Sequence, residues 1–308
     1  MAENNIEDIK TASDKRTVRK GYIFLSFIPF AIIMAVQTAT TTPGIILAML
    51  EMQKQGLPNE LSKLMEIFNE KYAAGAYVAY CVICIAVFIP WYYKGFVKKG
   101  TKTAYKKALG IKPIVLSISL LICLYLIISG LFILAERLVP DVMSKYAQLM
   151  EFSSLGSNMI ITILYGYLLG PVTEELCFRG LMYSMLEKSK MHYLLVIFIQ
   201  GLLFGVMHMN VVQSTYAFLL GIALGYIRYK YKTIFLSVGA HIVFNVFGTS
   251  VELFLEGAGI TDTQKIILGV IGAALAAAVL VVMLKDKNSY TKEGEDLMTA
   301  SRLPSDAS

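Results

Sequence analysis

The sequence predicts an all-α membrane protein, a polytopic bundle of about eight transmembrane helices. Of its 308 residues, 56% are hydrophobic and only 16% are charged, whereas soluble domains average about 25% charged. Apolar runs near the ~20 residues that a bilayer core requires recur along the chain. The basic residues gather in short segments between these runs, as the positive-inside rule describes. The net charge of +6 therefore indicates membrane orientation, and we expect no nucleic-acid partner.

Residues 1–20 form a polar N-terminus with several basic residues, and residues 21–157 hold the first three spans. We expect these spans at 22–36, 73–93 and 113–134. The basic head before the first short run predicts a signal anchor with its N-terminus in the cytoplasm. The loop 94–112 holds seven lysines and no acidic residue, which also indicates the cytoplasm. Segments 51–71 and 136–158 are mixed in charge and are expected outside.

The second half of the chain supplies five more spans. We expect them at 159–188, 193–209, 214–229, 234–255 and 266–284. Gly170-Pro171 lies in the middle of the first of these and should kink it or start its second half. Residues 158–250 form a candidate catalytic core, 251–284 lead through the last span, and 285–308 read as a polar, disordered tail. Both termini then lie in the cytoplasm of a multi-pass protein of the cell membrane.

Four cysteines lie in apolar runs, at Cys81, Cys84, Cys123 and Cys177. Cys81 and Cys84 form a CxxC pattern, but no second pair accompanies it, as a zinc or redox motif would need. We interpret all four as packing residues in helices. Cys177 lies within the most polar span and is expected to be an inert buried thiol.

Three polar groups interrupt the last spans at helical spacing. They are Glu174-Glu175-x-x-x-Arg179, Phe204-x-x-x-His208 and His241-x-x-x-Asn245. Each charged residue would cost about 2.5–3.5 kcal/mol at the centre of a helix facing lipid. Residues four apart share one face of a helix. The polar side chains must therefore face a protein interior or a wetted cavity, where ionisable groups mark a functional site.

The positions of these groups suggest hydrolytic chemistry. If the fourth and fifth spans form a hairpin, Glu174 and His208 differ in height by about 3 Å. His241 lies a helical turn or two lower on the same estimate. A carboxylate and a histidine can activate a water molecule, and uncharged donors from His241 and Asn245 can stabilise an oxyanion. These are the groups needed to cleave a peptide bond without a Ser or Cys nucleophile.

The two adjacent glutamates are expected to have different roles, one structural and one in proton transfer. Neighbouring residues on a helix point about 100° apart, so Glu174 and Glu175 should not serve the same spot. Glu175 shares a face with Arg179 and should form a structural ion pair with it. Glu174 has no basic residue three or four positions on, and it is left to take a proton from water.

The three motifs together resemble the CPBP family, the CAAX proteases and bacteriocin-processing enzymes also called the Abi family. The match spans 158–250, about a third of the chain. Eukaryotic relatives remove the tripeptide after a prenylated cysteine, and bacterial relatives are associated with peptide maturation, bacteriocin self-immunity and regulation. The resemblance implies an intramembrane endopeptidase acting on CAAX-like or leader-like peptides. Its site would lie inside the bundle, open toward the cytoplasm.

The resemblance also implies roles for individual residues. Glu174 and His208 would activate the water, and His241 and Asn245 would form the oxyanion hole. The supporting residues would be Glu175, Arg179 and Phe204. The implied partners are a peptide or lipidated-peptide substrate and the lipid bilayer.

Two further questions remain open from sequence. We expect hydrolysis without a cofactor or tightly bound metal, with zinc on Glu174, His208 and His241 as the alternative. A proton-coupled carrier is a second functional class, since Glu/His chains also relay protons, although the chain shows no inverted repeat. A non-catalytic scaffold or regulator of the same family is the third.

Overall fold

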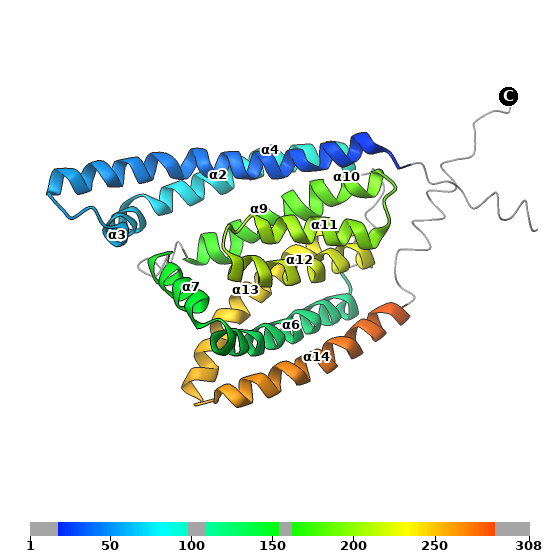
Figure 1. Ribbon diagram of the computed structural model, residues 1–308. Coiled ribbons are helices and arrows are strands. Elements are labelled where there is room, and N and C mark those ends of the chain that lie inside the picture. The colour runs from blue at the N-terminus through cyan, green and yellow to red at the C-terminus, as the bar shows by residue number, and fades with distance from the viewer. Residues whose placement is uncertain (1–17, 98–108, 154–161, 287–308) are drawn as a thin grey trace, which may run out of the picture.

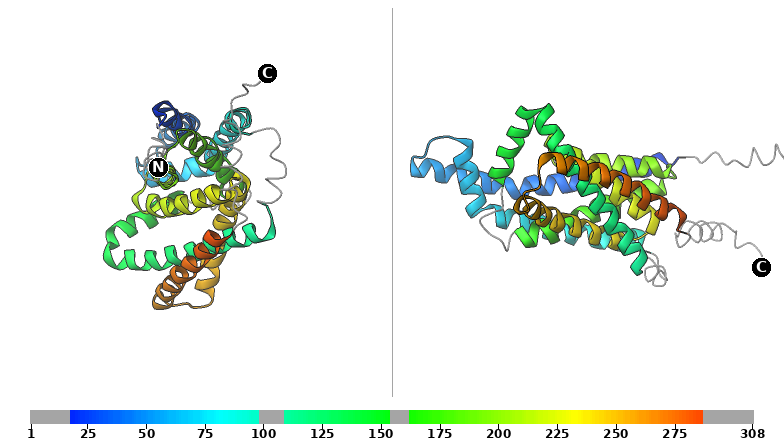
Figure 2. Two further views of the ribbon diagram at one scale, coloured as in Figure 1. Left: turned by 90° about the vertical axis from the view of Figure 1, so that its right-hand side faces the viewer. Right: turned by 90° about the horizontal axis from the view of Figure 1, so that it is seen from below.

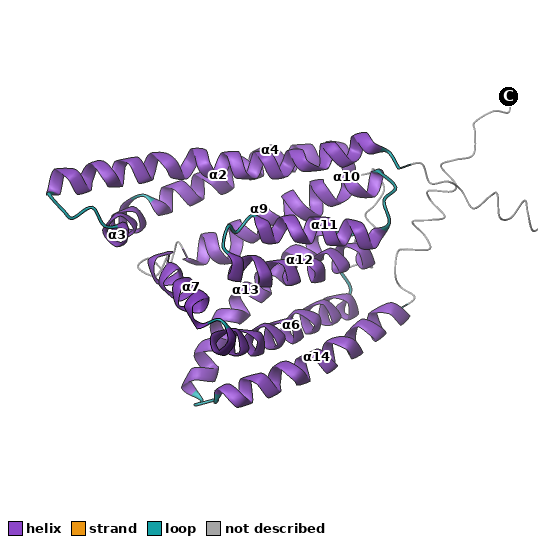
Figure 3. Cartoon of the chain, viewed as in Figure 1, coloured by secondary structure: helices purple, strands orange, loops and turns teal. Residues whose placement is uncertain are grey.

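The computed structural model describes residues 18–97, 109–153 and 162–286. Every regular element in these ranges is a helix (Figure 3). The first half contains α2 (Lys20–Gln55), α3 (Leu61–Lys71), α4 (Ala73–Phe96), α6 (Ile111–Leu138) and α7 (Pro140–Ser153). The second half contains η1 (Thr162–Leu169), α9 (Gly170–Glu175), η2 (Leu176–Met182), α10 (Tyr183–Lys188), α11 (Tyr193–Val206), α12 (Val211–Tyr231), α13 (Ile234–Gly257) and α14 (Asp262–Lys285). The all-α prediction is confirmed.

Two outer helix pairs enclose the middle of the molecule. The long helices α2 and α4 pack together on one side, and α6 packs against α14 on the other (Figure 1). The broken helix from η1 to α10 lies between them with α11, α12 and α13 (Figures 1 and 2). Helix α2 begins and α14 ends at the same end of the bundle (Figure 1). The three motifs therefore lie on central helices, shielded by the outer pairs.

Five of the described helices are long and apolar enough to cross a membrane: α2, α4, α6, α12 and α14. Two shorter apolar helices, Tyr193–Val206 and Ile234–Gly248, correspond to the predicted fifth span and most of the seventh. The predicted fourth span is the broken helix η1–α10. Each predicted span thus has a helical counterpart in the described ranges, while the number of membrane crossings stays a prediction.

The sequence prediction was wrong about two segments. The first span was placed at 22–36, but α2 continues through Pro29 and Pro43 to Gln55 as one helix of 36 residues. The sequence predicts a loop at 136–158, but Pro140–Ser153 forms α7. The hydrophobic pattern did not predict α7, because a short polar helix at the end of a bundle lacks the apolar stripe that marks a span. The N-terminal head, the tail and most of the lysine-rich loop lie outside the described residues.

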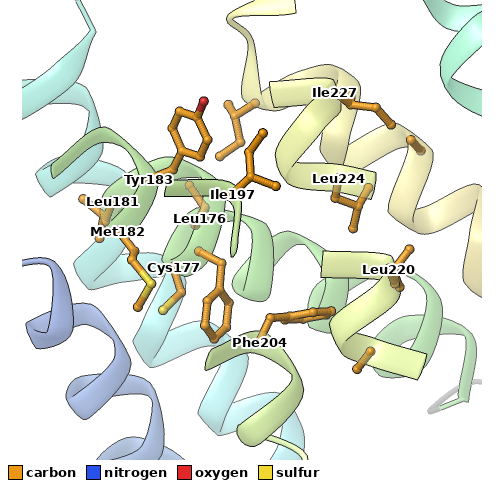
Figure 4. Packing of buried hydrophobic residues seen from close by; sticks show 14 of the residues in the cluster. Leu176, Cys177, Leu181, Met182, Tyr183, Ile197, Phe204, Leu220, Leu224 and Ile227 are labelled. Carbon is orange, nitrogen blue, oxygen red and sulfur yellow. The ribbon is translucent and has the colours of Figure 1, made fainter. Parts of the chain in front are cut away.

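The main hydrophobic core surrounds η2. Leu176, Cys177, Leu181 and Met182 are at most 7% exposed, and they pack with residues of α11 and α12 (Figure 4). All four cysteines are free thiols buried in helices, as predicted. A second, smaller core joins the far end of α2 to α3 and α4.

Helices α11 and α12 approach each other at glycines. A Cβ on Gly221 would lie 2.7 Å from the Cα of Gly201, and one on Gly205 would lie 2.6 Å from the carbonyl oxygen of Ser214. Glycines spaced by four residues permit this close backbone contact between membrane helices. The pair forms an antiparallel hairpin, which fixes the position of His208 in the turn between its two arms.

Candidate active site

The first motif lies where the fourth helical unit changes its winding. The wide π-helical segment η1 ends at Leu169, α9 begins at Gly170, and a second π-helical segment follows from Leu176. Gly170 allows this change because a Cβ there would lie 2.7 Å from the carbonyl oxygen of Tyr165. Pro171 occupies the first turn, where its missing N–H costs least. The predicted break is confirmed, and π-helical turns often occur at functional sites.

Glu175 is the fully buried acid of the motif. Arg179 Nη1 donates to its Oε1 at 2.7 Å, and both side chains are 0% exposed. Arg179 also donates through Nη2 to the carbonyl of Gly221 at 3.1 Å. The predicted ion pair between Glu175 and Arg179 is confirmed, and Arg179 additionally ties this helix to α12.

His241 on α13 lies between the two glutamates. Its Nδ1 is 3.1 Å from Glu175 Oε1, and its Nε2 is 3.8 Å from Glu174 Oε2. The expected depth mismatch of a turn or two does not occur. Although Glu174 and Glu175 leave α9 in different directions, they reach opposite sides of one imidazole ring. The two glutamates thus occupy different positions, as their spacing predicts, but they share His241, because the ring presents a nitrogen to each.

Glu174 is held less firmly than its neighbour. Its side chain is 17% exposed, and the distance to His241 is too long for a direct hydrogen bond. The carboxylate also interacts electrostatically with the phenol groups of Tyr80, Tyr165 and Tyr216. The 3.8 Å gap leaves room for a water oxygen to contact both the carboxylate and the imidazole.

His208 follows α11 in the turn to α12. Its Nδ1 lies 2.9 Å from the carbonyl oxygen of Phe204, and a carbonyl can only accept a hydrogen bond. Nδ1 therefore carries the hydrogen, and in the neutral ring Nε2 is left as a proton acceptor. The next residue, Met209, adopts a left-handed conformation with φ 55°, and Asn210 then caps α12 through Val212 and Gln213.

The predicted pairing of Glu174 with His208 is not a direct contact. No hydrogen bond or ion pair between described residues joins these two side chains. His208 instead lies beside Phe204, which is 1% exposed. The Phe204 ring contacts His208 and His241 edge-on, with centroids 5.3 and 5.7 Å away, and the Arg179 guanidinium lies 4.5 Å from its centroid. Phe204 thus positions both histidines and the arginine around one ring.

Asn245 lies one helical turn beyond His241 on α13. Its Nδ2 donates to the carbonyl of Gly166 in η1 at 3.0 Å. This contact takes one of the two hydrogens of the amide nitrogen, and it links α13 to the wide turn that precedes the motif. In the predicted oxyanion role, Asn245 would therefore donate the other hydrogen of Nδ2.

Sequence reasoning missed Gln200. It is 0% exposed and donates from Nε2 to the carbonyls of Ile197 and Gly221, both at 2.8 Å. The Gly221 carbonyl thereby accepts from both Gln200 and Arg179. A lone amide in the apolar run 194–203 was the available signal. The tyrosines near Glu174 gave none, because phenol groups are common in membrane helices.

The arrangement as placed does not form a three-ligand metal site. Among the described residues, no three His, Cys, Asp or Glu side chains converge as metal ligands would. In particular, Glu174 and His241 approach each other without His208 as a third ligand. We therefore derive no step through zinc from the proposed ligand set of Glu174, His208 and His241.

The fold and this geometry together define a class, a helical membrane protein with a buried carboxylate–histidine cluster. Residues 156–247 match the family model described as "Rce1-like: Type II CAAX prenyl endopeptidase Rce1-like", so this part of the chain is similar to CAAX-type intramembrane proteases. The match includes all three motifs and confirms the resemblance drawn from them. Searches of curated proteins and of solved structures each returned no match.

Proposed function

We propose that the protein is an intramembrane endopeptidase that cleaves peptide bonds of membrane-associated, CAAX-like or leader-like peptides. The observation that carries the proposal is the placement of Glu174 and His241 3.8 Å apart inside the bundle. Glu175 and Arg179 fix that histidine from its other side. A partly exposed carboxylate beside an oriented imidazole is an arrangement suited to activating water.

The reaction follows from the acceptors in the site. A water oxygen attacks the amide carbonyl while its proton passes to Glu174, with Nε2 of His208 as the second acceptor. The carbonyl π electrons move to oxygen and form a tetrahedral oxyanion. Collapse of this intermediate breaks the C–N bond, and the protonated acid returns its proton to the leaving amine. Neither a Ser nor a Cys nucleophile takes part.

The oxyanion donors proposed here differ from the sequence expectation in the charge of His241, which was expected to donate while uncharged. Glu175 is an ionised acceptor in its pair with Arg179, so Nδ1 of His241 is the donor between them. A neutral His241 would then have no hydrogen on Nε2, and only the imidazolium donates from both nitrogens. We therefore assign the oxyanion contact to protonated His241, assisted by Asn245.

We propose hydrolysis without a tightly bound metal. Metal analysis of purified, active protein provides the measurement, and we expect less than one zinc per chain and full activity after dialysis against a chelator. Stoichiometric zinc, with activity lost on its removal and restored on its return, would sink this part of the proposal.

The experiment for the function itself is peptide mass spectrometry on reconstituted protein. Synthetic membrane peptides, with and without a prenylated cysteine, are incubated with wild type and with Glu174→Gln. We expect defined cleavage products from wild type only. Glu187→Gln is a matched control, because Glu187 pairs with Lys232 in a partly exposed bridge. Peptide binding by wild type without any product would favour the scaffold, and proton uptake coupled to solute movement would favour the carrier.

A further inference from the structure

Gln200 is a buried amide on α11 that shares a helix face with Phe204 and His208. The three residues are spaced by four, so they form one stripe along the helix. Gln200 is 0% exposed, and its Nε2 donates to the carbonyls of Ile197 and Gly221, both at 2.8 Å. A carbonyl oxygen only accepts hydrogen bonds, so the nitrogen of the amide must face both carbonyls. The amide therefore joins its own helix to α12.

Helix α12 leaves room for this amide at Gly225. A Cβ on Gly225 would lie 2.2 Å from Nε2 of Gln200 and 3.1 Å from its Cδ, and the third nearest atom belongs to the side chain of Ile197. An added methyl group there would therefore meet flexible side chains, not backbone, and would push the amide aside. The contact between Gln200 and the Gly221 carbonyl can thus be broken from either helix.

Gln200 is bonded to the same oxygen atom as Arg179. The Gly221 carbonyl accepts from Nε2 of Gln200 at 2.8 Å and from Nη2 of Arg179 at 3.1 Å. A guanidinium is planar, so fixing Nη2 at this carbonyl also fixes the direction of Nη1. Nη1 donates to Oε1 of Glu175 at 2.7 Å, and Nδ1 of His241 lies 3.1 Å from the same oxygen. A continuous series of hydrogen bonds therefore leads from Gln200 to the imidazole of His241.

The amide is a poor choice for stability alone. Its Oε1 is buried and has no hydrogen-bond partner among the residues that the structure describes, and a buried acceptor without a partner is destabilising. Methionine is an unbranched side chain that would fill this space without an amide. The Gly221 carbonyl would still accept from Arg179, so the exchange would leave no buried acceptor unpaired. What methionine lacks is the hydrogen bond that holds the Gly221 carbonyl.

We propose that Gln200 is a positioning residue of the candidate active site. Its amide holds the Gly221 carbonyl in place for Arg179. Arg179 in turn orients Glu175 and, through it, the imidazole of His241. The proposal rests on the proposed endopeptidase function, in which His241 stabilises the oxyanion. Because Gln200 acts through other residues on a group used in the transition state, its loss should lower kcat and leave KM nearly unchanged.

Two variants break the contact from opposite sides. Gln200→Met removes the amide, and Gly225→Ala displaces it by placing a Cβ in its space. We expect each to lower kcat roughly 10–100-fold, the range for residues that orient the ligands of a metal site from behind. The melting temperature of Gln200→Met should equal or exceed that of wild type. The double variant should lose no more activity than either single variant, because both changes break one contact.

Two matched controls separate positioning from packing. Val196→Ala truncates a 1% exposed side chain on the same helix without touching the Gly221 carbonyl. Gly75→Ala adds a Cβ to α4 at a glycine with no atom within 4 Å of the new group, so it matches the change in helix propensity at Gly225. Both controls should keep the kcat of wild type. If kcat of the test variants is unchanged, or falls only together with the melting temperature as in Val196→Ala, the proposal is wrong.

A spectroscopic measurement does not depend on catalysis. The chain contains three histidines, so NMR of protein labelled with ¹⁵N-histidine gives few imidazole signals, and substitution assigns each one. We expect Gln200→Met and Gly225→Ala to change the Nδ1 and Nε2 signals of His241 and to leave those of His192 unchanged. Unchanged His241 signals in both variants would overturn the proposal. If wild type yields no cleavage product, the proposed function fails, while altered His241 signals would still support the positioning role of Gln200.

Discussion

Two faces of α9 each carry a carboxylate, and the two carboxylates differ in burial and in hydrogen bonding. Glu175 is completely buried and accepts from Arg179 and His241, while Glu174 is 17% exposed and approaches His241 only to 3.8 Å. A carboxylate committed to a guanidinium and an imidazole is a fixed structural element. A carboxylate without such a partner can take up and release a proton. The comparison teaches that sequence adjacency places two identical groups at one ring, while their partners decide what each group can do.

The largest effect should come from the looser glutamate. We expect Glu174→Gln to lower kcat below detection, because an amide cannot accept the proton from water, while the melting temperature changes little. The measurement is product formation beside thermal unfolding of the purified variant. Glu187→Gln should keep activity, since a partly exposed ion pair contributes at most about 1 kcal/mol. If Glu174→Gln still cleaves peptides, Glu174 is not the proton acceptor, and the proposed difference in role between Glu174 and Glu175 is wrong.

The fixed glutamate should act through stability. Glu175→Gln leaves Arg179 as a buried charge without its ionised partner, and breaking such a pair typically costs about 3–5 kcal/mol. We expect a clearly lowered melting temperature together with lower activity. If Glu175→Gln is as stable as wild type but inactive, while Glu174→Gln still cleaves, the roles assigned to the two glutamates must be exchanged.

A smaller loss of turnover is expected from a change on α13. Asn245→Ala should lower turnover by roughly 10²–10³, the range for one oxyanion donor. Loss of its hydrogen bond to Gly166 should cost about 1 kcal/mol of stability. Steady-state kinetics separates the two effects, because an oxyanion donor changes kcat and leaves KM nearly unchanged. A raised KM with normal kcat would assign Asn245 to substrate binding.

The smallest effect on activity is expected for a cysteine substitution that tests membrane topology. Lys102→Cys is placed in the lysine-rich segment and should leave activity unchanged. We expect an impermeant thiol reagent to label it only after the cell membrane is permeabilised, since the segment is predicted to be cytoplasmic. Labelling in intact cells would place the bundle end that carries this loop, and with it both termini, on the opposite side.

The sequence predicted the helices and the motif partners better than their contacts. Spacing of four residues correctly paired Glu175 with Arg179, because that geometry is local to one helix. The meeting of His241 with both glutamates was missed, since height estimates assume straight α-helices. The wide turns of η1 and η2 change both rise and facing direction around the motif. The contact between Asn245 and Gly166 was beyond sequence reasoning, because the acceptor is a backbone carbonyl exposed by that unusual winding.

The glycine contact between α11 and α12 also restricts how the molecule can move. Backbones that touch at Gly201 and Gly221, with Gln200 and Arg179 both bonded to the Gly221 carbonyl, cannot slide past each other without clashes and broken hydrogen bonds. The hairpin therefore travels as one body and carries His208 with it. In the proposed endopeptidase, a peptide would then reach Glu174 by hinge or shear displacement of the helices around this hairpin. His208, in the turn of the hairpin, would then keep its position relative to α11 and α12.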